Sequence, residues 1–174
     1  MKIQFAMASI ASLSIAVASC EPDPPKEVKL HLNEIMPSNQ FAHADEHGEY
    51  DDWLELYNGE SEEIDLEGYY VSDSSSDYFK RRLPAGLKIA ADGVLLLWAD
   101  GSIDQGINHL PFKLNATGED LYLTSPDGDL IDSYQWTNAF GDQSFARFPD
   151  GSGDFALCAY PTPDQKNGAA CGGQ

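Results

Sequence analysis

Short runs in which apolar and polar residues alternate follow one another along most of this chain of 174 residues. The alternation is clear in residues 28–35, 53–57 and 121–123. Because a period of two places successive side chains on opposite faces of an extended backbone, each run predicts a β-strand. Pairs typical of tight turns separate the runs, namely Asn58-Gly59, Asp92-Gly93, Asp100-Gly101, Asp127-Gly128 and Asp150-Gly151. No window shows a sustained helical period, so the chain is predicted to be all-β, as a sandwich or barrel.

Two of the apolar runs also predict how their strands are surrounded. Residues 94–98, VLLLW, are continuously apolar, which predicts a central strand covered on both faces. Residues 120–134 predict a hairpin, because two alternating arms flank the turn Pro126-Asp127-Gly128.

Two glutamates, Glu34 and Glu55, lie within the predicted strands. Alternation puts Glu55 on the same face as Trp53 and opposite Leu54, and it puts Glu34 opposite its own neighbours. We expect both carboxylates to face solvent, since charged residues are seldom buried without partners. The alternative is a small polar network, with Asn33 or Glu34, that fixes the first loop.

An ordered series of motifs runs from about residue 30 to 167: NEIM (33–36) with SN (38–39), EYDDWLELYN (49–58), DLEGYYVSD (65–73), LWADG (97–101), FKL (112–114) leading into GE (118–119), and RFPDGSG (147–153). In this order the motifs resemble the bacterial lamin-tail domain. The resemblance implies an immunoglobulin-like β-sandwich, assigned here to residues 28–174. It also implies an accessory or interaction module of a secreted or surface protein. No heptad repeat precedes the motifs, so a filament-forming role is not expected.

The N-terminus, MKIQFAMASIASLSIAVASC, combines Lys2 with an apolar stretch too short to span a bilayer. The small residues before Cys20 resemble the bacterial lipobox, whose cysteine takes a lipid. Residues 1–19 are therefore predicted to be a removed lipoprotein signal peptide, with lipidation at Cys20. The alternative is an ordinary secretory signal followed by a coincidental cysteine. Residues 20–27 read as a proline-rich tether, and Glu21 after the cysteine favours the outer membrane or cell surface within the cell envelope.

The chain has three cysteines. An odd number in an exported protein indicates that one has a separate role. If Cys20 carries the lipid, Cys158 and Cys171 remain, and an oxidising compartment would join them in a disulfide. Zinc is disfavoured at this pair because no further ligands stand nearby at metal-site spacing.

The formal net charge is −19. A chain this acidic lacks the basic footprint that phosphate binding requires, so nucleic-acid partners are excluded. Carboxylates crowd one segment, at Asp45, Glu46, Glu49, Asp51 and Asp52. These are candidate Ca²⁺ ligands, because calcium prefers hard oxygen donors, although the EF-hand spacing is absent. The main expectation is a solvated acidic loop that holds no ion.

Residues 43–47, HADEH, match the inverted zinc-protease motif H-x-x-E-H. That chemistry needs both histidines on one helical face, with the glutamate placed as general base. Pro37 precedes the motif, Gly48 follows it, and no helical period surrounds it. We therefore expect a chance match, and a metal-dependent hydrolase that uses His43 and His47 is kept as an alternative.

Aromatic residues are candidates for contact with a partner, because exposed rings stack on sugars and anchor proteins. Most are expected to pack in the core or at sheet edges. Trp136 and Phe140, in residues 135–142, are the candidates for an exposed binding role. The chain carries no nucleophile elbow, phosphate-binding loop or dinucleotide-binding motif, so no enzymatic activity is predicted.

Together these features predict a non-catalytic cell-envelope lipoprotein that presents a lamin-tail sandwich for binding or scaffolding. It would contact the membrane through its lipid anchor and bind a protein or glycan partner. One alternative is a Ca²⁺-dependent carbohydrate-binding or adhesion module. The other is the hydrolase built on His43 and His47.

Overall fold

The computed structural model describes residues 29–168 and Cys171, so Cys20 and the predicted signal peptide and tether lie outside the described residues. The described residues form strands and no helix, and accordingly contain no helix that could cross a membrane. The strands are β1 (Leu30–Met36), β2 (Asp52–Asn58), β3 (Ile64–Asp65), β4 (Tyr70–Ser72), β5 (Arg81–Arg82), β6 (Lys88–Ile89), β7 (Val94–Ala99), β8 (Gly118–Thr124), β9 (Leu130–Thr137), β10 (Ser144–Arg147) and β11 (Phe155–Cys158).

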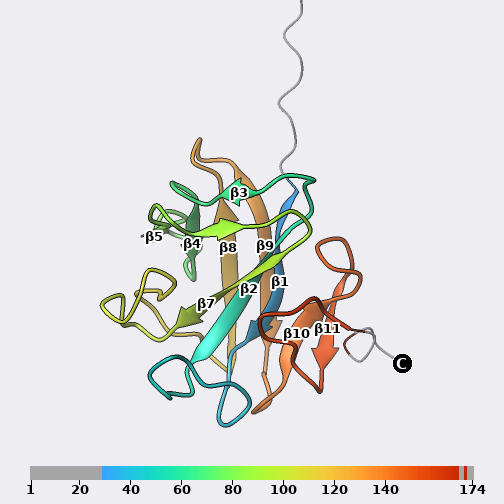
Figure 1. The fold of residues 1–174 in the computed structure, drawn as a ribbon. Coiled ribbons are helices and arrows are strands. Elements are labelled where there is room, and N and C mark those ends of the chain that lie inside the picture. Colours follow the sequence, from blue (N-terminus) through green and yellow to red (C-terminus); the bar gives the residue numbers. More distant parts are fainter. Residues whose placement is uncertain (1–28, 169–170, 172–174) are drawn as a thin grey trace, which may run out of the picture.

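The strands form a sandwich of two main antiparallel sheets (Figure 1). One sheet has the order β11-β10-β1-β2-β7, the other has the order β5-β4-β8-β9, and β3 pairs with β6 in a small third sheet. The main core contains buried side chains from both large sheets: Leu32, Leu54 and Leu97 from the first, Val71, Leu121 and Trp136 from the second. The predicted all-β immunoglobulin-like sandwich is confirmed.

A bulge in β1 sets which of its residues face the core. The pairing of β1 with β2 shifts register between Leu32 and Glu34. The extra residue, Asn33, lets Leu32 and Ile35 both join the main core although they are an odd number of positions apart. Glu34 is consequently directed to the outer face of the sheet.

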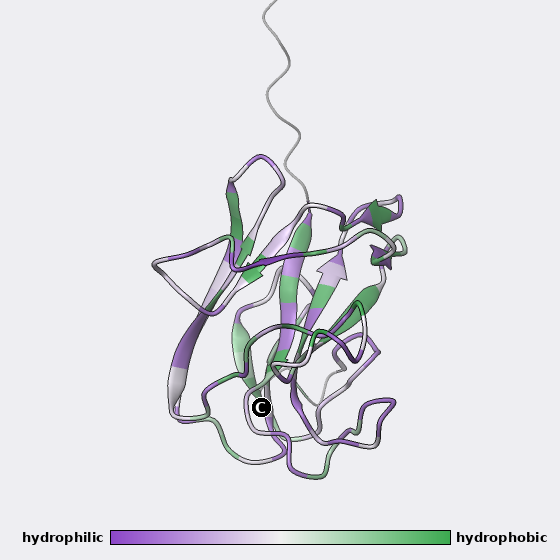
Figure 2. Ribbon diagram, turned by 90° about the vertical axis from the view of Figure 1, so that its left-hand side faces the viewer, coloured by the Kyte–Doolittle hydropathy of each residue, from purple (hydrophilic) through white to green (hydrophobic). Residues whose placement is uncertain are grey.

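Both faces of β2 are covered, which explains why nearly all of its side chains are buried. Leu54 and Leu56 enter the main core. On the outer face Trp53 packs in a second cluster, together with Met36, Leu96 and Trp98. In Figure 2 hydrophobic and hydrophilic residues alternate along several strands, as the sequence pattern predicts.

The prediction for residues 94–98 is wrong in one respect, because β7 lies at the edge of its sheet rather than in the centre. Both of its faces are nevertheless covered, by the main core at Leu97 and by the second cluster at Trp98. Its free edge is paired by a loop, in which Trp98 N–H donates to Asn108 O (2.9 Å) and Leu110 N–H donates to Trp98 O (2.8 Å). A continuous apolar run therefore indicates that both faces of a strand are covered, but it does not indicate which strands pair with it.

The predicted hairpin is present as β8 and β9, which pair from Gly118–Thr137 to Thr124–Leu130. At its turn Ser125 N–H donates to Asp129 O (2.8 Å), and Gly128 adopts a positive φ of 93°. Such a φ favours glycine, so the turn residues suit the observed backbone.

The sandwich has two distinct ends. β1 begins at Leu30 and runs to Met36, which pairs with Trp53 near the start of β2. The loops 37–51, 100–117 and 138–143 therefore lie at the Met36 end, and the first and last of these are seen at the bottom of Figure 1. We call this the loop end, and the Leu30 end the entry end.

Candidate functional site

The loop end is held together by hydrogen bonds between loops that are distant in sequence. Asp142 Oδ1 accepts the backbone N–H groups of Gln40 (2.7 Å), Phe41 (2.9 Å) and Ala42 (3.2 Å). These hydrogen bonds, above all the one from the Phe41 N–H, lower the pKa of Asp142 and outweigh the opposing effect of desolvation. Asn39 Nδ2 donates to the carbonyls of His43 (2.6 Å) and Asp51 (2.8 Å), which closes loop 37–51 on itself.

Three exposed aromatic rings project from these loops, and we call them the aromatic patch: Phe41, Tyr50 and Phe140. Their exposed fractions are 77%, 47% and 60%. Phe41 and Tyr50 meet edge to face with ring centroids 5.9 Å apart. Phe140 precedes Asp142, the residue that holds the backbone of Phe41, so the rings come from adjoining loops.

Trp136 and Phe140 are both predicted from the sequence to be exposed binding residues, but only one of them is exposed in the structure. Phe140 is exposed, but Trp136 is only 2% exposed and packs in the main core. Its indole N–H donates to Asn115 O (2.9 Å), so its polar atom is also engaged. The prediction for Trp136 is wrong, because the end of β9 is still covered by the opposite sheet.

A cleft of about 420 Å³ is lined by His43, Ala44, Asp45, Glu46, Leu95, Leu96, Trp98, Asn108 and Asp164. The His43 ring stacks on Trp98 with centroids 5.5 Å apart, and its Nε2 lies 3.5 Å from Asp164 Oδ2. His47 contacts the Gln105 carbonyl through Nε2 (3.4 Å). Residues 43–47 form a loop with a turn and no helix. The one-faced helical geometry that H-x-x-E-H requires is therefore not formed.

Loop 37–51 gathers some of the predicted calcium ligands and leaves others apart. Ligand atoms of Asp45, Glu49 and Asp51 lie within 4.8 Å of one another. Glu46 lies instead in a second such group, formed by Asp45, Glu46 and His109. Asp52 belongs to neither of these two groups. It accepts the Asn39 N–H (3.1 Å), and burial raises its pKa to about 6.

His109 was missed in the sequence analysis. It is fully buried, its Nδ1 lies 2.7 Å from Asp100 Oδ2, and its Nε2 lies 3.3 Å from Glu46 Oε1. Burial works to lower the His109 pKa, but the carboxylates of Asp100 and Glu46 outweigh it, and the pKa is raised. Glu46 is 63 residues away along the chain, so no local sequence motif predicts this pairing.

Two further carboxylates, Glu34 and Glu55, sit opposite each other on β1 and β2 and are both fully buried. Glu34 accepts hydrogen bonds from the hydroxyls of Ser144 and Thr162 and from the Thr162 N–H. Glu55 Oε1 accepts the Asp164 N–H, while its Oε2 is buried and has no hydrogen-bond partner within residues 29–168 and Cys171. Burial, followed by the charge of Glu34, raises the pKa of Glu55 to about 9.

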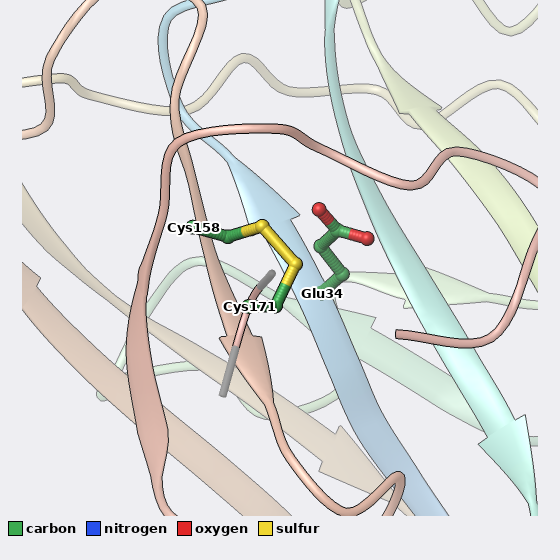
Figure 3. Close-up of side chains that lie close together, drawn as sticks. All are labelled: Glu34, Cys158 and Cys171. Atoms are coloured by element: carbon green, nitrogen blue, oxygen red, sulfur yellow. A yellow bond between two sulfur atoms is a disulfide. The ribbon is translucent and has the colours of Figure 1, made fainter. Parts of the chain in front are cut away.

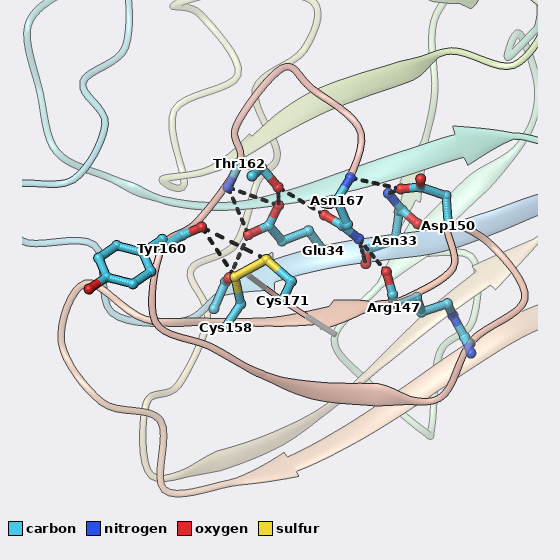
Figure 4. The surroundings of a disulfide bond; sticks show 10 residues. Asn33, Glu34, Arg147, Asp150, Cys158, Tyr160, Thr162, Asn167 and Cys171 are labelled. Atoms are coloured by element: carbon cyan, nitrogen blue, oxygen red, sulfur yellow. Dashed lines mark hydrogen bonds between the residues drawn. A yellow bond between two sulfur atoms is a disulfide. The ribbon is translucent and has the colours of Figure 1, made fainter. Parts of the chain in front are cut away.

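The prediction that Glu34 and Glu55 face solvent is wrong, because residues 159–167 cross the outer face of the sheet and cover them. The alternative, a small polar network, is formed, but it does not fix the first loop. Asn33 Nδ2 donates to Asp150 Oδ1 (2.8 Å), and Asn167 Nδ2 donates to Asn33 O (3.0 Å). The network therefore fixes the C-terminal segment rather than the first loop (Figure 4).

A disulfide joins Cys158 to Cys171, as the cysteine pattern predicted. Figure 3 shows the bond beside the Glu34 carboxylate. These three residues are close enough to share an ion, but the sulfurs are bonded to each other and provide no thiolate. We call the covering segment 159–167, with this disulfide, the C-terminal cover.

Comparison with protein families gives one match. The model of the family described as Lamin Tail Domain matches residues 23–138, well over half of the chain. The match includes β1 to β9 and loop 37–51, and ends before the C-terminal cover. A search of curated proteins finds none that matches the chain.

Proposed function

The chain belongs to the lamin tail domain family, and from this we propose that it is a non-catalytic, lipid-anchored binding module of the cell envelope. The family is one of immunoglobulin-like modules without catalytic activity. The anchor would be the lipid on Cys20, and residues 20–27 would hold the sandwich off the membrane. The partner would bind at the loop end, and the observation that carries this proposal is the aromatic patch.

The position of the patch suits an anchored molecule. The described chain enters the sandwich at residue 29 and leaves β1 at Met36, at the opposite end. Seven strand residues extend roughly 20 Å. An anchor attached before residue 29 would therefore leave the aromatic patch directed away from the membrane, where a partner can reach it.

The composition of the patch favours a protein partner. Exposed aromatic rings that are grouped together are the residues that dominate protein interfaces. Isolated exposed apolar residues are ordinary on a protein surface, but here two of the three rings are in contact. The net charge of −19 would steer encounter with a basic surface and disfavour an acidic one.

Site-specific crosslinking in the native cell tests this proposal. A photoreactive residue placed at position 41 or 140 is expected to give a discrete crosslinked product. The same residue at position 62, an exposed site near the entry end, is the control and should give none. Equal products from all three positions, or none from 41 and 140, would reject the loop end as the binding surface.

The anchor is tested separately. Cys20→Ser should abolish lipidation and move the protein from the membrane fraction to the soluble fraction, because a lipid anchor contributes about 0.8 kcal/mol per buried CH₂. If the variant is processed as before and stays membrane-bound, the lipoprotein assignment is wrong.

A second candidate function rests on the grouping of Asp45, Glu49 and Asp51, which adjoins the aromatic patch through Tyr50. In this version the module binds carbohydrate with the help of Ca²⁺, whose oxygen ligands such a group could supply. Glycan-array binding that requires Ca²⁺ and is lost in Asp51→Asn would favour it over a protein partner. Binding that is unchanged by chelator would exclude it.

A further inference from the structure

We propose that Asp45, Glu46 and His109 bind a divalent transition-metal ion of the zinc type. Their ligand atoms lie within 4.8 Å of one another. Asp45 and Glu46 come from loop 37–51 and also line the cleft, whereas His109 comes from the loop that pairs with the edge of β7. An ion at this point would bridge the two loops.

Asp45 has an oxygen available for the ion. Its Oδ1 accepts the N–H groups of His47 (2.8 Å) and Glu49 (2.8 Å). Its Oδ2 is buried and has no hydrogen-bond partner among the described residues, and the residue as a whole is only 8% exposed. A buried carboxylate oxygen without a partner is costly, and a bound cation would remove that cost.

His109 is oriented as a ligand usually is in metal sites. Asp100 Oδ2 lies 2.7 Å from Nδ1, which leaves Nε2 directed toward Glu46. A carboxylate on the second ring nitrogen fixes the orientation of a metal-binding histidine and raises its basicity. Asp100 is thus a positioning residue, and it is itself held because its Oδ1 accepts the Ser102 N–H (2.8 Å).

The donor set and its spacing distinguish the type of ion. Zinc accepts imidazole nitrogen and carboxylate oxygen at about 2.0–2.1 Å, which places two ligands of a tetrahedral ion roughly 3.3 Å apart. His109 Nε2 and Glu46 Oε1 are 3.3 Å apart. Calcium disfavours nitrogen and requires six or more oxygens. Three protein ligands would leave a fourth position, on the side where Asp45 and Glu46 line the cleft.

Gly106 keeps room for this arrangement. A Cβ at this position would lie 2.9 Å from His109 Cδ2 and 3.4 Å from Glu46 Oε1. Any larger residue would force the His109 ring or Asn108, whose Oδ1 also lies 2.9 Å from this position, to shift, so the close approach of the backbone here depends on glycine.

The test uses the full chain without a polyhistidine tag, and Zn²⁺ alone as the probe. Titration calorimetry and metal analysis after dialysis are expected to show one ion per chain. Glu46→Gln should weaken binding at least tenfold, and its half-exposed side chain (51%) makes folding secure. Glu62→Gln, an exposed glutamate near the entry end, is the matched control and should bind as the unmodified chain does.

Two further measurements examine His109 and its support. Asp100→Asn should weaken Zn²⁺ binding by about 10- to 100-fold, because the amide removes the negative charge that raises the basicity of the His109 ring. Co²⁺ in place of Zn²⁺ should give the visible absorption of a tetrahedral site, and His109→Gln should abolish it. If His109→Gln does not fold, the Co²⁺ spectra of Glu46→Gln and Glu62→Gln decide the question in its place.

Three results would overturn the proposal. One is the absence of stoichiometric Zn²⁺ binding. Another is equal affinity in Glu46→Gln and Glu62→Gln. The third is binding that Asp51→Asn abolishes and Glu46→Gln leaves intact, because the ion would then belong to the Asp45, Glu49 and Asp51 group. None of these results bears on the crosslinking at positions 41 and 140, so the binding proposal stands or falls separately.

Discussion

Two groups of acidic side chains lie in opposite surroundings, one on the five-stranded sheet and the other in loop 37–51. Glu34 and Glu55 are sealed under the C-terminal cover, where their oxygens accept from hydroxyl and N–H groups and, in the part of the chain that the structure describes, form no ion pair. Asp45 and Glu46 border an open cleft and share a histidine. Burial of the sealed pair, Glu34 and Glu55, can be stabilised only by hydrogen bonds and by a proton bound to one of the carboxyl groups. The open group is compensated by an imidazole and can exchange ions with solvent.

The comparison assigns different tasks to the two groups. Burial of carboxylates under a covering segment ties the end of the chain to β1 and β2, which is a structural role. An oxygen without a partner next to a cleft and a histidine is placed to bind a ligand. If this distinction is correct, changes at the sealed pair should alter stability, and changes at the open group should alter binding.

The largest effect is expected from removal of the disulfide. Cys158→Ser with Cys171→Ser releases a loop with a sequence separation of 13 residues. In the chain-entropy model this should lower the free energy of unfolding by about 3 kcal/mol. Urea denaturation of the variant and of the reduced protein measures the loss. A change below about 1 kcal/mol would mean that the C-terminal cover is held by its hydrogen bonds alone.

A somewhat smaller loss is expected from Asn167→Ala. The Asn167 side chain donates to the carbonyls of Asn33 (3.0 Å) and Arg147 (2.8 Å) in a buried setting. Its removal leaves these acceptors without that partner, at about 2 kcal/mol. Thermal and urea unfolding should both report the loss, while Zn²⁺ affinity stays unchanged. Weaker Zn²⁺ binding in this variant would show that the two groups are coupled.

The pH dependence of stability should reveal the proton held by Glu55. Its pKa is about 9 in the folded chain against an ordinary value of 4.5. The folded state therefore binds the proton more tightly than the unfolded state does. This contribution is complete below about pH 4.5 and is lost as the pH rises through about 9.

Glu55→Gln should flatten this dependence, because the amide keeps an oxygen for the Asp164 N–H and cannot ionise. At pH 9 we expect the variant to be more stable than the parent by about 1–2 kcal/mol, with little difference at pH 5. Denaturation curves across that interval provide the measurement. A parent protein whose stability is constant from pH 5 to 9 would contradict the raised pKa.

The smallest effect on stability is expected at the open group. Glu46→Gln removes a half-exposed charge that contacts His109, and should change the free energy of unfolding by no more than about 0.5 kcal/mol in the metal-free protein. Phe41→Ala, at 77% exposure, should be equally mild. A loss above about 2 kcal/mol in either variant would show that the substituted residue has a structural role. The separation of structural and binding residues would then fail at that position.

The strands and the hairpin could be predicted because they depend on local alternation and turn residues. The disulfide followed from the number of cysteines once Cys20 was set aside. The sheet position of β7 could not be predicted, since a continuous apolar run reports that both faces are covered and not which strands lie beside it. The burial of Trp136 could not be predicted either, because its indole N–H donates to a carbonyl 21 residues away in the sequence.

The errors at Glu34 and Glu55 share one cause. Alternation correctly placed both on the outer face of the sheet, but the segment that covers this face comes from more than 100 residues further along the chain. His109 escaped notice for a related reason, because its partner Glu46 lies on another loop. Sequence patterns describe which face a residue occupies, whereas its surroundings depend on segments brought together by the fold.

The loop that pairs with β7 has a consequence for self-association. An uncovered edge strand offers unpaired N–H and C=O groups to a second molecule, and edge-to-edge addition is a common route to aggregates. Here Asn108 and Leu110 occupy these groups at Trp98, so the loop that presents His109 also guards the sheet edge. Substitutions that loosen this loop would leave the sandwich folded but expose the edge of β7. Such variants would aggregate and precipitate under conditions in which their core is still intact.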